Sequence, residues 1–224
     1  MAWVRLILVR HGDAHAGFHG LVPGRRGCGG LTDRGREQAA SLRAYLSGHD
    51  RVKADVLVAS TLPRAIETAQ IIAPALGFEA VEESCDLCEV HTGEADGLEW
   101  AEYGTRYGTF MMQDEPDRVF APQGESWNSF HERVQSMLER VAREYTRETV
   151  VAVCHAGVIM ASVRVLLGMP GGGVLGGLRP TNTGLTEWEH DDATKLWTLH
   201  SFNETPHLVA PVARSSGAVR PRGG

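Results

Sequence analysis

Residues 3–12 read WVRLILVRHG, an apolar run that ends in Arg10, His11 and Gly12. A short apolar run of this kind is typical of a buried β-strand. In an open α/β sheet, ligands bind in the crevice at the carboxyl ends of the strands, so these three residues would stand where an anion can bind. The stretch therefore predicts an α/β fold and one edge of an active site.

The composition narrows the class of protein. The 224 residues are enough for one sizeable core, and an α/β domain of this length is often single. A formal net charge of -6 argues against nucleic acid or an anionic membrane as a general partner. No segment approaches the roughly 20 apolar residues that span a bilayer, and no signal-peptide pattern is found. We expect a cytoplasmic protein whose anion site is a local concentration of positive charge.

Hydrophobic patterning predicts strands that alternate with helices. Glycine-rich residues 13–31 lack periodicity, which is typical of a loop over the strand ends. Further strands are expected at 54–59, 79–82 and 149–154, followed by a hairpin at 184–189 and 195–202 with its turn at 190–193. Helices are expected at 32–47, 62–76, 98–103, 126–145 and 158–167. This order favours a three-layer α/β sandwich, with a mostly parallel central sheet and helices on both faces.

The helix starts and the domain limits follow from local signals. Thr32 is the expected N-cap of its helix, Pro63 fits a first helical turn, and Arg133 falls on the polar, solvated face of its helix. We expect one domain over residues 1–209, with a cap insertion at about 90–124. A flexible connection at 171–177 and a disordered tail at 210–224 are predicted from their composition.

Three of the expected strands end in polar residues. Arg10 and His11 follow the first strand, Arg64 opens the helix after the second, and His155 follows the strand at 149–154. Guanidinium groups can hold the oxygens of an anion bidentately. This constellation indicates an anion site.

The order of these residues resembles the motifs of the histidine phosphatase superfamily, which includes the cofactor-dependent phosphoglycerate mutases. The similar segments are Arg10-His11-Gly12, Leu31-Thr32 with Gly35 and Gln38-Ala39, Ser60-x-Leu62-x-Arg64-Ala65-x-x-Thr68-Ala69, Leu87-x-Glu89, Gly124-Glu125-Ser126, His155-x-Gly157 and Asn182-Thr183. They extend over about residues 3–208. The resemblance implies a phosphomonoesterase that acts on a small phosphorylated metabolite and uses no metal and no other cofactor.

The resemblance also implies roles for single residues. His11 would attack phosphorus and become a phosphohistidine, and Glu89 would protonate the leaving oxygen and then activate water. Arg10 and Arg64 would bind the phosphate oxygens, and His155 would stabilise charge on them.

Backbone groups would complete the phosphate site that the resemblance implies. They are those of Gly12 and the N–H groups that open the helix at Ala156.

Two departures from the family pattern leave the substrate open. The run His11-Gly12-Asp13-Ala14 is similar to the RHG(D/E)A variant of some small phosphohistidine phosphatases, so a phosphohistidine-protein phosphatase is one alternative. A phosphoglycerate mutase is another, but Glu94 and Asp96 follow the acid and would repel a second phosphate. Hydrolysis is therefore expected to dominate.

Two further classes of protein compete with this interpretation. His11-x-Asp13-x-His15 with His19 is compatible with a metal-dependent hydrolase, although that would leave the arginine motifs unexplained. A non-catalytic binding module would be expected to have lost a catalytic residue, and none is lost. Nothing in the sequence excludes a homodimer.

The four cysteines, at positions 28, 85, 88 and 154, show no disulfide-scaffold spacing. Cys85-x-x-Cys88 with His91 is similar to part of a zinc site. Only one such cysteine pair is present, so it is a weak indication of zinc binding.

Overall fold

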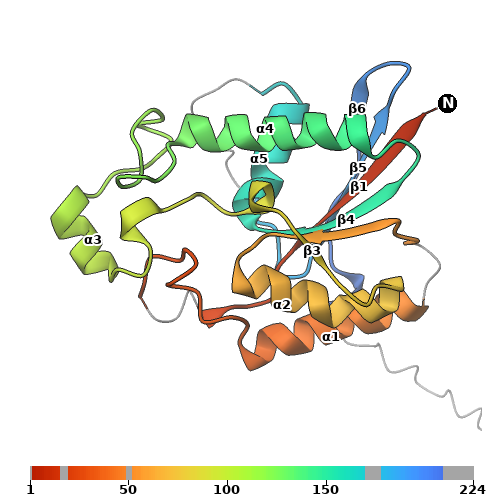
Figure 1. Cartoon of the computed structure of the whole chain (residues 1–224), viewed down its shortest axis with the longest axis horizontal. Coiled ribbons are helices and arrows are strands. Elements are labelled where there is room, and N and C mark those ends of the chain that lie inside the picture. Colours follow the sequence, from red (N-terminus) through yellow and green to blue (C-terminus); the bar gives the residue numbers. More distant parts are fainter. Residues whose placement is uncertain (1, 16–19, 49–51, 170–177, 209–224) are drawn as a thin grey trace, which may run out of the picture.

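The computed structural model describes residues 2–15, 20–48, 52–169 and 178–208. At its centre lies a sheet in the order β3-β2-β4-β1-β5-β6 (Figure 1). Neighbouring strands from β3 to β1 are parallel, whereas β5 and β6 are antiparallel to their neighbours. The strands are β1 (Trp3–Arg10), β2 (Val56–Ala59), β3 (Glu82–Glu83), β4 (Thr149–Cys154), β5 (Leu185–Asp191) and β6 (Leu196–Glu204).

Helices cover both faces of this sheet, as Figure 1 shows. One face carries α1 (Asp33–Gly48) and α2 (Pro63–Ile72), and the other carries α4 (Trp127–Glu144) and α5 (Ala156–Leu166). Alternate residues of β1 serve the two layers: Leu6 and Leu8 pack with α4 and α5, while Ile7 packs with α1 and α2. The three-layer α/β architecture with a mostly parallel sheet is confirmed.

The element limits differ from expectation where the sequence is least apolar. The strand expected at 79–82 is only the two-residue β3, at the exposed edge. The α-helix expected at 62–76 ends at Ile72 and continues as a 3-10 turn, because Pro74 has no N–H to donate. Helix α3 (Trp100–Tyr107) begins later than the expected range 98–103 and ends at Gly108, whose φ is 77°.

The strand expected at 54–59 starts at Val56, and β5 runs through Asp191 so that the hairpin turn falls at 192–195. The segments 171–177 and 210–224 lie outside the described residues. Within the described part of the chain, no helix combines the length and apolar composition needed to cross a membrane.

The helix starts behave as their sequences predict. Thr32 Oγ1 accepts the N–H of Gly35 at 3.0 Å, which makes Thr32 the N-cap of α1. Pro63 stands in the first turn of α2, where its missing N–H costs no helical hydrogen bond. Ser126 and Ser129 form a reciprocal capping box at the start of α4.

The loop after β1 and the segment around α3 pack together beyond the sheet. Val22 shares a small buried cluster with Ala95, Tyr103 and Ala121. The Asp96 carboxylate accepts the backbone N–H groups of residues 26 and 27 at 2.9 and 3.0 Å. These contacts join the two segments into one layer at the edge of the molecule.

Candidate active site

The carboxyl ends of β1, β2 and β4 bring the sequence-predicted residues together. Arg10 pairs in register with Cys154, so the next residues, His11 and His155, leave neighbouring parallel strands side by side. The centroids of their rings lie 5.0 Å apart. Ser60, which follows β2, places its Oγ 2.8 Å from Nε2 of His155.

Hydrogen bonds fix the His11 ring in one tautomer. Arg64 Nε donates to His11 Nε2 at 3.2 Å, and His11 Nδ1 lies 2.6 Å from the carbonyl oxygen of Gly12. A guanidinium group can only donate, so Nε2 must carry the lone pair and Nδ1 the proton. The nitrogen that faces Arg64 is therefore the one that carries the lone pair.

Both active-site imidazoles are held neutral. Burial lowers the pKa of His11 well below its usual value, and the charges of Arg64 and Arg10 lower it further against the hydrogen bond to Gly12. Burial also lowers the pKa of His155 well below its usual value, with smaller contributions from Arg64 and His11. A neutral imidazole near pH 7 keeps a lone pair that can attack an electrophile.

Arg64 is buried and Arg10 half-buried, and neither forms an ion pair within the described residues. Arg64 is 3% exposed and donates to Pro23 O at 3.3 Å, while Arg10 donates to Pro180 O at 2.6 Å. Arg10 Nε is buried without a hydrogen-bond partner among the described residues. Burial lowers the pKa of Arg10, and the nearby Glu89 charge partly offsets that effect. Buried positive charge is costly unless paired, so this arrangement favours a bound anion.

Glu89 reaches the same place from the loop after the 3-10 turn Cys85–Leu87. Its Oε2 accepts the backbone N–H of Gly157, in the first turn of α5, at 3.0 Å. A Cβ atom at position 157 would stand 2.0 Å from Glu89 Oε1. A side chain at position 157 would therefore push the Glu89 carboxylate out of its present place.

Two motif residues support the His11 backbone. Thr68 Oγ1 accepts the N–H of Gly12 at 3.0 Å, and Asn182 Nδ2 donates to the carbonyl oxygen of His11 at 2.9 Å. A Cβ on Gly12 would lie 2.6 Å from Gly35 O, so the loop after β1 rests directly on α1. These contacts of Thr68 and Asn182 hold the loop after β1 in place.

Asp13 is also tied to α1 rather than to the neighbouring histidines. Its N–H donates to Gln38 Oε1 at 2.9 Å, and its Oδ2 accepts from Thr32 Oγ1 at 2.7 Å. Among the described residues, Asp13 belongs to no group of three ligands that could hold a metal ion. His19, the remaining residue of that alternative, lies outside the described residues.

Arg133 is the main functional residue that sequence reasoning misplaced. Its side chain is 13% exposed rather than solvated, and it pairs with Glu125 at 2.7 Å. It also donates to the carbonyl oxygens of Asp86, Cys88 and Glu89 at 2.8, 3.0 and 3.3 Å. A helical pattern places a residue on a face but does not show that a loop covers that face, so no sequence signal could have found these contacts.

The contacts of Ser60 were also not anticipated. Its hydroxyl joins His155 to Cys88, whose Sγ lies 3.3 Å from Ser60 Oγ. Burial raises the pKa of Cys88, but hydrogen bonds from His91, Ser60 and Thr61 outweigh it and lower that pKa to about 6. A polar chain therefore runs from the imidazole of His155 into the loop that carries Glu89.

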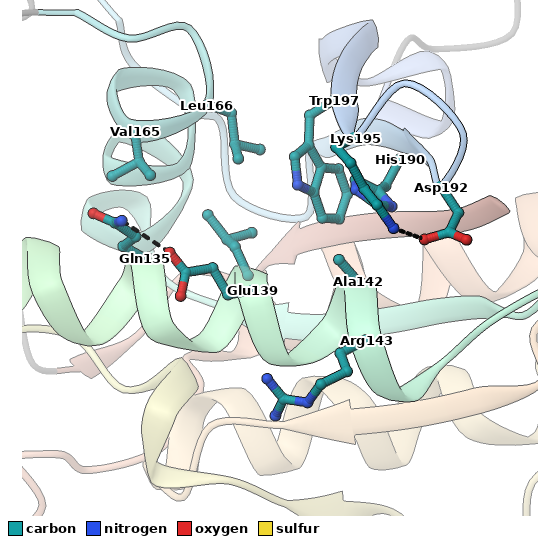
Figure 2. A pocket seen from close by; sticks show the side chains of 11 residues that line it. Gln135, Glu139, Ala142, Arg143, Val165, Leu166, His190, Asp192, Lys195 and Trp197 are labelled. Carbon is teal, nitrogen blue, oxygen red and sulfur yellow. Dashed lines mark hydrogen bonds and ion pairs between the residues drawn. The ribbon is translucent and has the colours of Figure 1, made fainter. Parts of the chain in front are cut away.

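A separate groove of about 420 Å³ lies between α4, α5 and the β5–β6 hairpin (Figure 2). Its lining includes His190, Trp197 and the ion pair of Asp192 with Lys195. His190 pairs with Val4, at the end of β1 opposite to Arg10. At about 3.3 Å per strand residue, the groove is on the order of 20 Å from His11 and does not belong to the candidate active site.

Comparisons with known proteins agree with this geometry. Residues 6–205 match the Histidine phosphatase superfamily (branch 1). Phosphoserine phosphatase 1 of Hydrogenobacter thermophilus is 33% identical over 172 residues, which cover 74% of this chain and 77% of that protein. The adenosylcobalamin/alpha-ribazole phosphatase of Escherichia coli is 28% identical over 179 residues, or 75% of this chain and 81% of that protein.

Among solved structures, a phosphoserine phosphatase from Entamoeba histolytica in complex with 3-phosphoglyceric acid has a TM-score of 0.73 and 27% identity. The match covers 92% of this chain and 100% of that one. The chain thus belongs to the histidine phosphatase superfamily and is an enzyme of that family. The resemblance inferred from the motifs is confirmed.

The neutral imidazoles predict a loss of stability in acid. The unfolded chain takes up a proton at an ordinary imidazole pKa of about 6.5, whereas buried His155 stays neutral. Stability should therefore fall as the pH drops through that value, by up to about 1.4 kcal/mol per such histidine between about pH 7.5 and about pH 5.5.

Urea unfolding of the wild type and of His155→Gln at both pH values measures the effect. The glutamine retains a polar group toward Ser60 but cannot titrate. The variant should lose about 1 kcal/mol less than the wild type over this range. An identical pH dependence in the two proteins would show that His155 is not kept neutral by the fold.

Proposed function

We propose that the enzyme hydrolyses a small phosphomonoester through a phosphohistidine on His11. The observation that carries this proposal is a neutral imidazole with a fixed lone pair, held against the buried guanidinium of Arg64 beside half-buried Arg10. None of the ion pairs within the described residues includes either arginine. A phosphate group would supply the missing negative charge and give Arg10 Nε an acceptor.

The first step forms a bond between His11 Nε2 and phosphorus and breaks the bond from phosphorus to the ester oxygen. Binding of the phosphate oxygens draws the Arg64 guanidinium from His11 Nε2 and frees the lone pair for in-line attack. His155 and the N–H groups around Gly12 and Ala156 stabilise the charge on the transferring phosphoryl group.

Glu89 moves the proton in both steps. It donates its proton to the leaving ester oxygen, and the resulting carboxylate then takes a proton from the water that attacks the phosphohistidine. Its hydrogen bond to Gly157, two residues after His155 at the start of α5, supports this role. The second step releases inorganic phosphate and restores His11 as the neutral imidazole.

We further propose that residues 1–209 act as one domain, in which residues 90–124 form a cap over the leaving-group side. The packing of Val22 against Tyr103 and the bonds of Asp96 to the loop at 26–27 support this role. Substrate choice would then depend on the layer formed by residues 20–31 and 90–124.

Phosphoserine and similar small phosphorylated acids are the proposed substrate class. A phosphoserine phosphatase relative and the similar structures solved with phosphoserine and with 3-phosphoglyceric acid support it. The charge argument against mutase activity is weaker than the sequence implies, because the Asp96 carboxylate is bound by two backbone N–H groups and lies 3.8 Å from Arg26. Glu94 remains exposed on this side and favours a substrate with one phosphate.

Rapid-quench labelling tests the proposed intermediate. The wild type mixed with a radioactive phosphoester should form an acid-labile, alkali-stable adduct on His11, and His11→Asn should form none.

Specificity constants for phosphoserine, 3-phosphoglycerate, sugar phosphates and a phosphohistidine peptide should then be highest for a small phosphorylated acid. The proposal fails if His11→Asn turns over at the wild-type rate, or if mutase turnover primed with bisphosphoglycerate exceeds release of inorganic phosphate.

Gly157→Ala tests the placement of Glu89. The added methyl group would collide with the carboxylate, while alanine suits the first turn of α5. We expect the melting temperature to stay within a few degrees and kcat to fall about 100-fold, a typical loss for a displaced general acid.

Gly48→Ala is the matched control, because a Cβ there meets no atom of the described residues within 4 Å. It should leave kcat unchanged. Wild-type kcat in Gly157→Ala would contradict the role of Glu89.

A further inference from the structure

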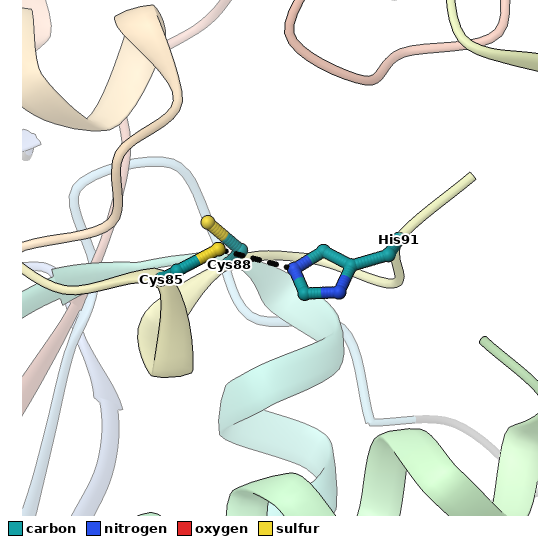
Figure 3. A group of neighbouring side chains, drawn as sticks. All are labelled: Cys85, Cys88 and His91. Atoms are coloured by element: carbon teal, nitrogen blue, oxygen red, sulfur yellow. Dashed lines mark hydrogen bonds between the residues drawn. The ribbon is translucent and has the colours of Figure 1, made fainter. Parts of the chain in front are cut away.

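Three potential metal ligands gather beside the active site without belonging to the proposed reaction. They are Cys85, Cys88 and His91, whose ligand atoms all lie within 4.8 Å of one another (Figure 3). Cys85 Sγ lies 3.3 Å from His91 Nε2. Within the described residues, this is the group of three that could hold a metal ion. All four cysteines of the chain are free thiols.

The loop that carries these ligands is rigidly framed. Arg133 donates to the carbonyl oxygens of Cys85, Asp86 and Cys88 at 3.4, 2.8 and 3.0 Å. Glu125 holds the same arginine at 2.7 Å and accepts the backbone N–H of His91 at 2.9 Å. The three side chains are therefore presented by a backbone that is already fixed, which reduces the ordering cost of binding.

The His91 ring has the orientation of a metal ligand. One ring nitrogen, Nε2, faces Cys85, and the other, Nδ1, lies 3.5 Å from Oε1 of Glu125. Histidines that bind metals commonly donate their second ring N–H to a carboxylate, which fixes the tautomer with a lone pair toward the metal. Glu125 is placed to provide this contact.

We propose that Cys85, Cys88 and His91 form a three-ligand site for a divalent metal of borderline-soft character, with zinc as the best fit. Thiolate sulfur and imidazole nitrogen are preferred zinc ligands, and tetrahedral bond lengths of about 2.0–2.3 Å place neighbouring ligand atoms about 3.5–3.8 Å apart. Because the ligand atoms lie within 4.8 Å of one another, their separations must change by about 1 Å at most to reach this geometry. Cys85 is exposed and His91 half-buried, so the fourth position opens to solvent.

This site is distinct from the phosphoryl chemistry but adjoins it. Glu89 stands between two of the ligands in the sequence, and Cys88 contacts Ser60, which contacts His155. A bound metal would hold this loop in place without taking part in bond making. The proposal rests on the ligand geometry and does not depend on the proposed reaction.

Cobalt(II) titration of the reduced wild-type protein tests the site directly. Cobalt bound by two thiolates in a tetrahedral site produces thiolate charge-transfer bands and intense visible bands. We expect these bands to saturate at one equivalent and to disappear when one equivalent of zinc is added. Cys85→Ser should weaken cobalt binding at least 10-fold, and Cys28→Ser, which alters a thiol elsewhere, should leave it unchanged.

His91→Gln is a second ligand variant and should also weaken cobalt binding at least 10-fold. Circular dichroism and the melting temperature establish that each variant is folded. The proposal is overturned if the wild type shows no saturable bands, or if Cys85→Ser and His91→Gln bind cobalt as tightly as the wild type. It is equally overturned if Cys28→Ser abolishes the bands.

Discussion

The structure depends on keeping an uncharged imidazole beside two guanidinium groups, one buried and one half-buried. In water these three side chains would not stay together, because the two guanidinium groups repel each other and are hydrated. The parallel neighbours β1 and β4 hold His11 and His155 at one sheet edge, and α2 carries Arg64 to His11. The resulting field lowers the pKa of His11, so the same charges that attract a phosphate also keep the nucleophile unprotonated.

Much of this arrangement can be predicted from the sequence because it follows from strand ends. The apolar run of β4 is continuous and that of β1 is interrupted only by Arg5, and the residues after parallel strands must meet at one edge. Arg10, His11 and His155 therefore lie together at the edge that the sequence predicts. Helix caps such as Thr32 can also be predicted from the sequence, since capping depends on residues within one turn.

Contacts between segments far apart in the chain could not be predicted in this way. The periodicity of α4 places Arg133 on the polar face of the helix. In the structure, the loop around Cys88 covers this side chain, and its carbonyl oxygens accept hydrogen bonds from the guanidinium group. The Ser60 hydroxyl was expected only as part of a motif, and its bond to His155 depends on the spacing between β2 and β4. The sequence predicts that Asp96 repels a second phosphate, whereas its carboxylate accepts two backbone N–H groups of the loop after β1.

The central claim is that His11 is neutral, with its proton on Nδ1 and its lone pair on Nε2. Nitrogen-15 NMR of histidine-labelled protein measures this state directly, because protonated and unprotonated ring nitrogens differ widely in chemical shift. Comparison with His11→Asn assigns the signals. Near pH 7 the account predicts one protonated and one unprotonated nitrogen, with Nε2 the unprotonated one. Two protonated nitrogens on His11, or a proton on Nε2, would contradict it.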